Sequence, residues 1–262
     1  MNKEKNEFFT EDFPSPEQIM RDVEKDGYHI YQNAIKLDIY NKIRDFWLEY
    51  FSSDKPELEV VRGGLVLGEE NFNAYTDTEY WKLFRHFDFL WNQPTHEIST
   101  KIAVELHKKR NLALGLDEEF GLKFTPDCDG IYISTSYYPP NIGTMKPHED
   151  GYIKNKDFPL LHFMLPITFK GVDYEKGGLM VWDKNDKKID VDEIMKPGSI
   201  LFYLGQHKHG VETIIPYKDK GTELGRLAIF AIPVVFKKQK AQRENIAMGK
   251  KQSKVLKIFK KN

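Results

Sequence analysis

The sequence has one cysteine, no long apolar run and almost no net charge, and each shortage excludes a class of protein. A single cysteine, Cys128, excludes an internal disulfide and favours a reducing compartment. No apolar stretch approaches the roughly 20 residues that cross a bilayer, and the polar N-terminus does not resemble a secretion signal. We therefore expect a soluble, cytoplasmic protein without a transmembrane segment.

The charges are balanced over the whole chain but not along it. The formal net charge of −1 gives no reason to expect nucleic acid as a partner. Residues 237–262, however, contain ten of the 39 Lys and Arg residues and one of the 40 acidic residues. This basic tail is interpreted either as a solvated helix with a small apolar seam or as a surface for anionic lipid or an acidic partner. Nothing in the sequence indicates the oligomeric state.

What is present is enough apolar material for a large core. Hydrophobic residues make up 40% of the 262 residues, with no internal repeat and no low-complexity linker, so we expect a single domain spanning 1–262. Residues 1–124 are mainly helical in pattern. Ser15 begins the first helix as its cap and Gly27 ends it. The remaining expected elements of this part are short strands at 28–31 and 59–61 and helices at 37–51, 78–92 and 97–109.

After residue 124 the sequence pattern changes from mainly helical to a series of short strands. Runs with strand character lie at 130–138, 159–169, 178–182, 199–204, 210–215 and 226–236, separated by turn residues. Such a series predicts an antiparallel sandwich or barrel, of which a double-sheet jelly roll is the simplest form. The expected fold is therefore mainly β with α: a jelly-roll core at 125–236, helical N-terminal support at 1–124 and the basic tail at 237–262.

Chemistry concentrates around His148 and Asp150. In an extended strand these two side chains point to the same face, because side chains alternate with period two. An imidazole and a carboxylate side by side can bind one divalent metal ion, and a second histidine would complete the triad that suits non-haem Fe(II). His209, within Gln206–Glu212, is the expected third ligand, with His207 as the competing candidate on the same face.

Arg226 stands at the head of an apolar strand. A guanidinium in such a place is costly unless a carboxylate meets it in bidentate fashion. Because Asp150 is assigned to the metal, we expect a bound anionic cosubstrate to be that partner, with an ion pair within the protein as the structural alternative.

These residues together resemble the Fe(II)/2-oxoglutarate-dependent oxygenases, and among them the phytanoyl-CoA dioxygenase-like group. The resemblance covers residues 125–236 and is carried by the order and spacing of short motifs: His148-x-Asp150, Gly177-Gly178-Leu179, Pro197-Gly198-Ser199, His209-Gly210-Val211 and Arg226. It implies a double-stranded β-helix of the cupin-like kind, Fe(II) on His148, Asp150 and His209, and Arg226 on the far carboxylate of 2-oxoglutarate. The interval from His209 to Arg226 is longer than the family pattern, and residues 217–223 are interpreted as an inserted loop.

Three further residues are candidates for binding the cosubstrate. Tyr137 or Tyr138 can donate a hydrogen bond to the 2-oxoglutarate carboxylates, although core packing or contact with the substrate explains both equally well. His162, inside an apolar run, is either a core histidine with a hydrogen-bond partner or a residue beside the cosubstrate.

Three functions compete at this point. The leading one is an oxygenase that uses Fe(II), 2-oxoglutarate and O2 to hydroxylate a small or medium metabolite, releasing succinate and CO2. The others are a metal-dependent cupin-type oxidase that does not use 2-oxoglutarate, and a non-catalytic jelly-roll binding module. An anionic small-molecule substrate would suit the lysines expected around the site, which a solvated rim explains equally: Lys146, Lys154 and Lys156.

Overall fold

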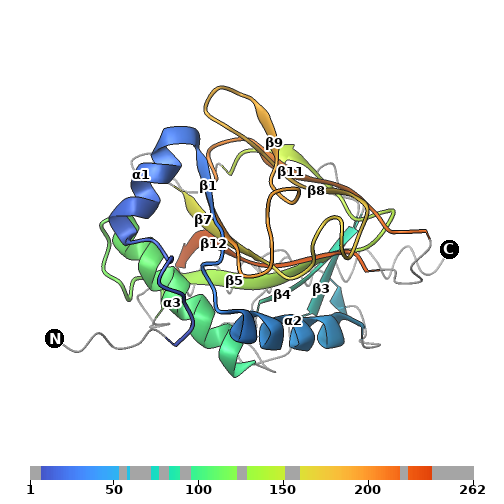
Figure 1. Cartoon of the computed structure of the whole chain (residues 1–262), viewed down its shortest axis with the longest axis horizontal. Helices are drawn as coiled ribbons and strands as arrows, with labels where there is room; N and C mark the ends of the chain where they lie inside the picture. Colours follow the sequence, from blue (N-terminus) through green and yellow to red (C-terminus); the bar gives the residue numbers. More distant parts are fainter. Residues whose placement is uncertain are drawn as a thin grey trace.

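The computed structural model describes residues 7–52, 58–59, 72–76, 83–88, 96–122, 129–150, 160–218 and 224–237 (Figure 1). Side chains are described over 7–52, 96–122, 133–150, 160–218 and 224–230. The basic tail beyond Lys237 and the segments 151–159 and 219–223 lie outside the described residues. None of the described helices is long and apolar enough to cross a membrane.

Three helices, α1 (Pro16–Asp26), α2 (Leu37–Ser52) and α3 (Glu97–Ala113), are found in the described part of the chain. They confirm three of the predicted helices. The hydroxyl of Ser15 accepts a hydrogen bond from the backbone N–H of Gln18, and Gly27 ends α1 with φ of 87°. Each helix buries one face, for example Ile39, Ile43 and Trp47 of α2.

The helix predicted over residues 78–92 is wrong, because the structure has a strand, β4 (Leu83–Asp88), in this range. β4 pairs with β3 (Phe72–Thr76) on one side and with β5 (Asp129–Tyr138) on the other. A short apolar segment fits helical and extended periods alike, and the exposed edge of a neighbouring strand decides between them. Two more strands precede α3: β1 (Tyr28–Tyr31) and β2 (Leu58–Glu59). The first 124 residues therefore contribute strands as well as helices.

The described residues between 129 and 237 form the predicted jelly roll. After β5 come β6 (Met145–His148), β7 (Leu161–Pro166), β8 (Lys176–Trp182), β9 (Lys188–Asp190), β10 (Ile200–Leu204), β11 (His209–Ile215) and β12 (Arg226–Lys237). The chain alternates between two sheets along this series, except that β8 and β9 are neighbours in the same sheet. Among the described residues, one sheet has the order β1-β10-β7-β12-β5-β4-β3-β2 and the other the order β6-β11-β8-β9. All pairs are antiparallel except β2 with β3. This alternation between two facing sheets makes the core a double-stranded β-helix.

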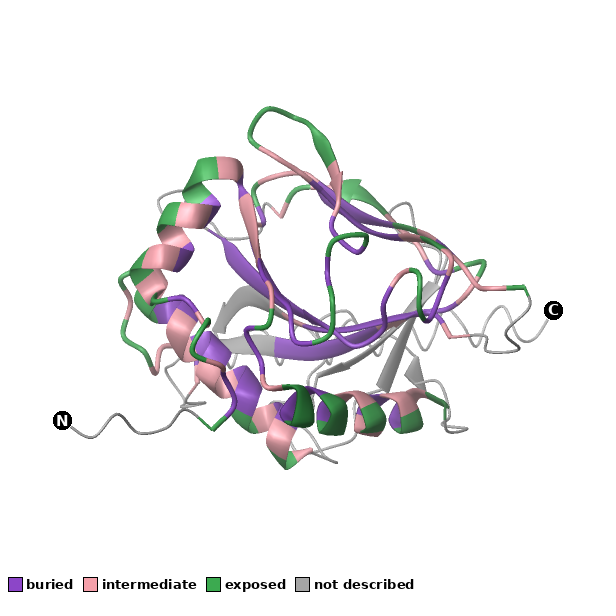
Figure 2. Ribbon diagram, in the orientation of Figure 1, coloured by how far each residue is buried: buried purple, intermediate pink, exposed green. Residues whose placement is uncertain are grey.

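The two faces of the larger sheet serve two different cores. Leu161, Phe163 and Phe202 face the helices, which cover the outer side of this sheet (Figure 1). Met164, Leu201 and Tyr203 face the smaller sheet. Figure 2 shows buried residues along the described parts of the larger sheet and on the inner sides of the helices. Period-two alternation thus places every second residue of β7, β10 and β12 inside the jelly roll, where the polar residues of interest gather.

Candidate metal centre

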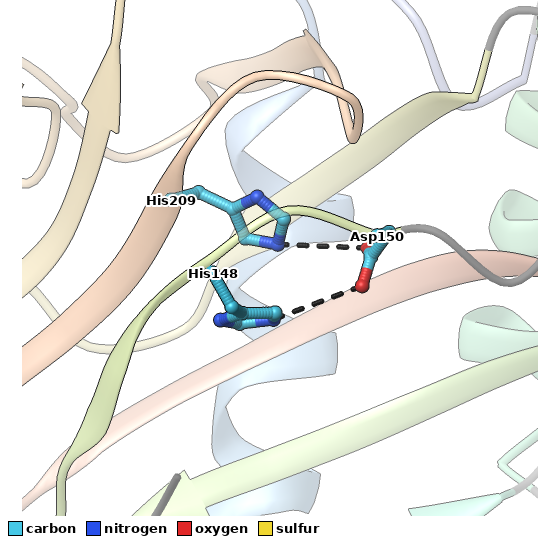
Figure 3. A group of neighbouring side chains, drawn as sticks. All are labelled: His148, Asp150 and His209. Carbon is cyan, nitrogen blue, oxygen red and sulfur yellow. Dashed lines mark ion pairs between the residues drawn. The ribbon is translucent and has the colours of Figure 1, made fainter.

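His148, Asp150 and His209 converge on one point between the two sheets. His148 ends β6, Asp150 follows two residues later, and His209 begins β11 directly opposite His148 in the strand pairing. One ligand atom from each side chain lies within 4.8 Å of the others, and the three side chains point toward one another (Figure 3). The backbone N–H of Asp150 donates to the carbonyl of Gly205 at 2.8 Å, which anchors the carboxylate after β6 has ended.

Backbone contacts orient both imidazoles. Nδ1 of His148 donates to the carbonyl of Lys146 at 2.9 Å, and Nδ1 of His209 donates to the carbonyl of His207 at 3.0 Å. A carbonyl only accepts, so the proton sits on Nδ1 and the lone pair of Nε2 is directed at the shared point. This is the tautomer that a metal ion requires of a histidine bound through Nε2. His207, the competing candidate, does not join the group, and its ring lies beside Gly27 at the end of α1.

Protonation at the site also suits a cation. Burial by itself raises the pKa of Asp150, but the hydrogen bond and charge from His162, followed by the charges of His209 and His148, lower it to about 2. Burial is the main cause that lowers the pKa of His209 to about 4; repulsion from His148 and His162 adds to it, and Asp150 opposes it. Near neutral pH the carboxylate is therefore ionised and the His209 imidazole uncharged.

The donor set fits a divalent ion that takes nitrogen and oxygen ligands, Fe(II) among them. Two imidazoles and one carboxylate form the set that leaves positions open for other ligands. His148 and Asp150 each keep 23% of their side chains exposed, whereas only 8% of the His209 side chain is exposed. A partly exposed three-residue site of this kind differs from a closed structural site, which has four protein ligands.

Arg226 has a carboxylate partner within the protein, Asp192, which the sequence analysis did not identify. Nε of Arg226 donates to Oδ2 of Asp192 at 2.6 Å, and Nη2 donates to Oδ1 at 3.1 Å. Oδ2 also accepts from the hydroxyl of Tyr174 and the backbone N–H of Leu179. Contrary to what the sequence led us to expect, burial of Arg226 therefore does not require a bound anion, because Asp192 neutralises the guanidinium. Nη1 has no hydrogen-bond partner in the part of the chain that the structure describes.

The two tyrosine candidates separate onto opposite faces of β5. Tyr138 lies inside the jelly roll, directly across from Arg226 in the strand pairing, and its hydroxyl approaches Sδ of Met145 at 3.9 Å. Tyr137 points the other way, and its ring centroid is 5.7 Å from that of Phe51 in α2. The expectation that Tyr137 binds the cosubstrate is not supported, because alternation along the strand directs its side chain to the helical layer.

His162 lies at the site, and so does Tyr203, which sequence reasoning missed. Nε2 of His162 lies 3.0 Å from Oδ2 of Asp150. Tyr203 stacks on the His162 ring at 4.9 Å and meets the His209 ring edge-on at 5.2 Å. Burial raises the pKa of Tyr203, and the charge of Asp150 raises it further. The signal available in the sequence was strand alternation: Tyr203 lies two residues after Leu201, so both side chains point into the jelly roll.

Comparison with solved structures shows the same fold in proteins of very different sequence. The chain is similar to a prolyl-4-hydroxylase from Pseudomonas putida, with a TM-score of 0.54 and 13% identity over 84% of this chain and 98% of that one. A prolyl hydroxylase from Trichoplax adhaerens, in complex with a hypoxia inducible factor peptide, has a TM-score of 0.53 and 12% identity over 87% and 91%. SnoN, a non-heme alpha ketoglutarate dependent epimerase from nogalamycin biosynthesis, has a TM-score of 0.50 and 11% identity over 83% and 82%.

The sequence itself matches neither a family model nor a curated protein. At identities of 11–13% the structural likeness establishes the fold but not the reaction. The reaction depends on the residues that this chain places at the site.

Proposed function

We propose that this protein is a non-haem Fe(II)- and 2-oxoglutarate-dependent oxygenase that hydroxylates a small or medium metabolite. The observation that carries the proposal is the convergence of His148, Asp150 and His209, with both Nε2 atoms directed inward, inside a double-stranded β-helix. The similar structures add support, since two are prolyl hydroxylases and the third is a non-heme alpha ketoglutarate dependent enzyme.

In this proposal His148, Asp150 and His209 hold the iron. With bound Fe(II), O2 and 2-oxoglutarate supply the oxidation of a substrate C–H bond to an alcohol, with release of succinate and CO2. The jelly-roll interior keeps the His209 side of the site away from water, because His209 and the neighbouring Tyr203 are both buried. The exposed side of His148 and Asp150 faces the entry of substrate.

Tyr138 and Arg226 are the proposed contacts for the cosubstrate carboxylate. They face each other across the β5–β12 pair, both are buried, and Nη1 of Arg226 remains available after Asp192 has engaged Nε and Nη2. Asp192 then serves to fix the plane of the guanidinium, so that a second carboxylate meets a pre-oriented donor.

The proposal extends to the subgroup of oxygenases, the charge of the substrate, the domain organisation and the location of the protein. The phytanoyl-CoA dioxygenase-like grouping depends on the short motifs of the sequence, whereas the similar structures named above are prolyl hydroxylases and an epimerase. An anionic small-molecule substrate depends on lysines at the site, of which Lys146 is exposed and the other two lie outside the described residues. We also propose that the chain forms a single oxygenase domain and that the protein is cytoplasmic.

Anaerobic titration with Fe(II) and then 2-oxoglutarate tests the proposed function. Chelation of the iron by the 2-oxo acid is expected to produce a weak visible charge-transfer band, and admission of O2 with a turnover substrate is expected to release succinate. A screen of candidate metabolites for succinate release then identifies the substrate class. Iron-loaded protein that develops no such band with 2-oxoglutarate would contradict the proposal.

Arg226→Lys isolates the cosubstrate contact better than Arg226→Ala does. Alanine would strand the buried carboxylate of Asp192, whereas lysine keeps a positive charge beside it and removes the Nη1 donor. We expect Arg226→Lys to weaken 2-oxoglutarate binding by about 10-fold or more, as the loss of one charged hydrogen bond implies, with metal affinity unchanged. Tyr138→Phe is the matched variant for the hydroxyl on the opposite strand.

A metal-dependent oxidase of the cupin type that does not use 2-oxoglutarate is the second candidate. The observation in its favour is the bidentate pair of Arg226 with Asp192, which leaves the guanidinium neutralised without any ligand. This alternative predicts that Fe(II) binds, that 2-oxoglutarate does not, and that Arg226→Lys changes no binding constant.

A further inference from the structure

His162 lies closer to Asp150 than either metal-ligating histidine does. Its Nε2 is 3.0 Å from Oδ2 of Asp150, against 3.5 Å for His209 and 3.7 Å for His148. His162 nevertheless falls outside the group of three whose ligand atoms lie within 4.8 Å of one another. Its place is therefore behind the carboxylate, where it contacts a ligand without belonging to the ligand set.

The fold holds this imidazole firmly in place. Only 1% of His162 is exposed, and it lies on β7 opposite Tyr203 of β10, whose ring stacks on it with an angle of 17° between the planes. Tyr203 therefore covers one face of the imidazole, and the Nε2 edge of the ring lies beside the carboxylate of Asp150.

Gly205 leaves the space that the imidazole occupies. A Cβ atom at this position would lie 2.1 Å from Nε2 of His162 and 3.3 Å from Oδ2 of Asp150. Gly205 is not among the glycines with positive φ, so space and not backbone conformation explains its identity. Its carbonyl accepts the backbone N–H of Asp150, so one residue fixes the backbone of the ligand and makes room for the contact with its side chain.

We propose that His162 is a positioning residue, which donates its Nε2–H to the carboxylate of Asp150 and holds that carboxylate in the orientation that binds the metal, and that residue 205 is glycine to admit this ring. Groups that orient a metal ligand from behind commonly contribute 10- to 100-fold to metal affinity. The proposal rests on the proposed metal centre and is independent of the identity of the cosubstrate.

The test is Co(II) titration of the metal-free full chain, followed by calorimetry and by the visible absorption of bound Co(II). We expect His162→Ala to weaken Co(II) binding about 10- to 100-fold and to change the Co(II) spectrum. His162→Gln is expected to restore most of the affinity, because its amide nitrogen reaches the position of Nε2 and can donate the same hydrogen bond. His107→Gln, which replaces a buried histidine of α3 away from the site, is the matched control and should bind Co(II) as the wild type does.

Gly205→Ala tests the same contact from the other side. It keeps the imidazole but displaces it, so its loss of Co(II) affinity should be similar to that of His162→Ala. The double variant His162→Ala/Gly205→Ala should bind no more weakly than His162→Ala, since the displaced ring is no longer present. Additive losses in the double variant would overturn the proposal, because they would show that the two residues act separately.

The remaining outcomes separate this proposal from the one on which it rests. If the wild type binds no Co(II), the metal centre fails and the role of His162 fails with it. If the wild type binds Co(II) and His162→Ala binds it with the same affinity and spectrum, only the role of His162 is overturned. A folded His162→Gln protein that loses as much affinity as His162→Ala would exclude the donated hydrogen bond.

Discussion

Inside the jelly roll, hydrogen bonding and side-chain size constrain the identity of individual residues as much as hydrophobicity does. Asp192 shows this most clearly, because Arg226, Tyr174 and the backbone of Leu179 all donate to its carboxylate, and the residue is only 5% exposed. A buried carboxylate is tolerated when both of its oxygens accept hydrogen bonds and a guanidinium neutralises its charge. The carboxylate in turn needs room, which Gly178 provides.

Gly178→Ala should therefore be strongly destabilising. A Cβ atom there would lie 2.4 Å from Oδ2 of Asp192, and φ of 114° is unfavourable for alanine. We expect a loss of about 2 kcal/mol or more in the free energy of unfolding, measured in urea. Gly171→Ala is the control, since its φ of 82° is also positive but nothing lies within 4 Å. Equal losses in the two variants would show that crowding of Asp192 contributes nothing.

Between elements, one ion pair joins the helical layer to the jelly roll. Nη2 of Arg44 in α2 lies 2.6 Å from Oδ1 of Asp173, between β7 and β8, and Nη1 donates to Oδ2 at 3.1 Å. Oδ2 of Asp173 also accepts the backbone N–H of Phe169, and Arg44 further donates to the carbonyl of Ile167. The pair thus fixes α2 against the turn that follows β7.

Asp173→Asn should loosen this junction. Asparagine can still accept from Phe169, but Arg44 loses its counter-charge in a place where only 21% of its side chain reaches water. We expect the free energy of unfolding to fall by about 2 kcal/mol, at the lower end for a broken buried pair because water screens Arg44 in part. Glu212→Gln, which breaks the exposed pair with Lys188, should change stability little. Similar effects of the two substitutions would contradict a structural role for the Arg44–Asp173 pair.

At the scale of the whole molecule, metal binding should stabilise the fold. The three ligands come from β6, the residues after it and β11, so an ion that binds them favours the folded chain over the unfolded one. Mn(II) at a concentration 100 times its Kd is expected to add about 2.7 kcal/mol, seen as a rise in Tm that EDTA reverses.

Variants of the histidines decide whether that stabilisation comes from the proposed site. His148→Ala should abolish the metal-dependent rise in Tm, whereas His207→Gln should retain it, because the His207 ring lies beside Gly27. A rise that survives His148→Ala would place the bound ion elsewhere.

Stability should also fall as the solution becomes acidic, and His107 of α3 is one cause. Burial and, after it, the nearby Arg110 lower the pKa of His107 to about 2, and the hydrogen bond from Nε2 to the carbonyl of Phe120 opposes this shift. Below pH 6.5 the unfolded chain takes up a proton at this histidine that the folded chain does not, so stability decreases by about 1.4 kcal/mol per pH unit.

His107→Gln isolates this contribution from that of other titrating groups, because its amide can keep the hydrogen bond to Phe120. Between pH 7.5 and 5.0 the wild type should lose about 2 kcal/mol more than His107→Gln in urea unfolding. An equal loss in the two proteins would contradict the neutral state of buried His107.

The sequence predicts the structure best where the relevant pattern lies within a few consecutive residues. Helical spacing and a capping serine predict α1, and strand-like runs between turn residues predict β5, β7, β8, β10, β11 and β12 of the jelly roll, whereas the short strands β6 and β9 lie outside the predicted runs. The metal group is predicted for the same reason, since His148 and Asp150 are two residues apart and the resemblance to a known motif order supplies His209. Local periodicity is a property of consecutive residues, so it can be read without coordinates.

Pairings between distant residues were decided only by the tertiary structure. The segment 83–88 became a strand because β3 and β5 lie beside it, and Arg226 found Asp192 across 34 positions of sequence. His162, Tyr203 and Gly205 acquire their relation to Asp150 only when β7 and β10 pair. Such contacts depend on which strands become neighbours, and sequence spacing carries no information on the distance between side chains that belong to different strands.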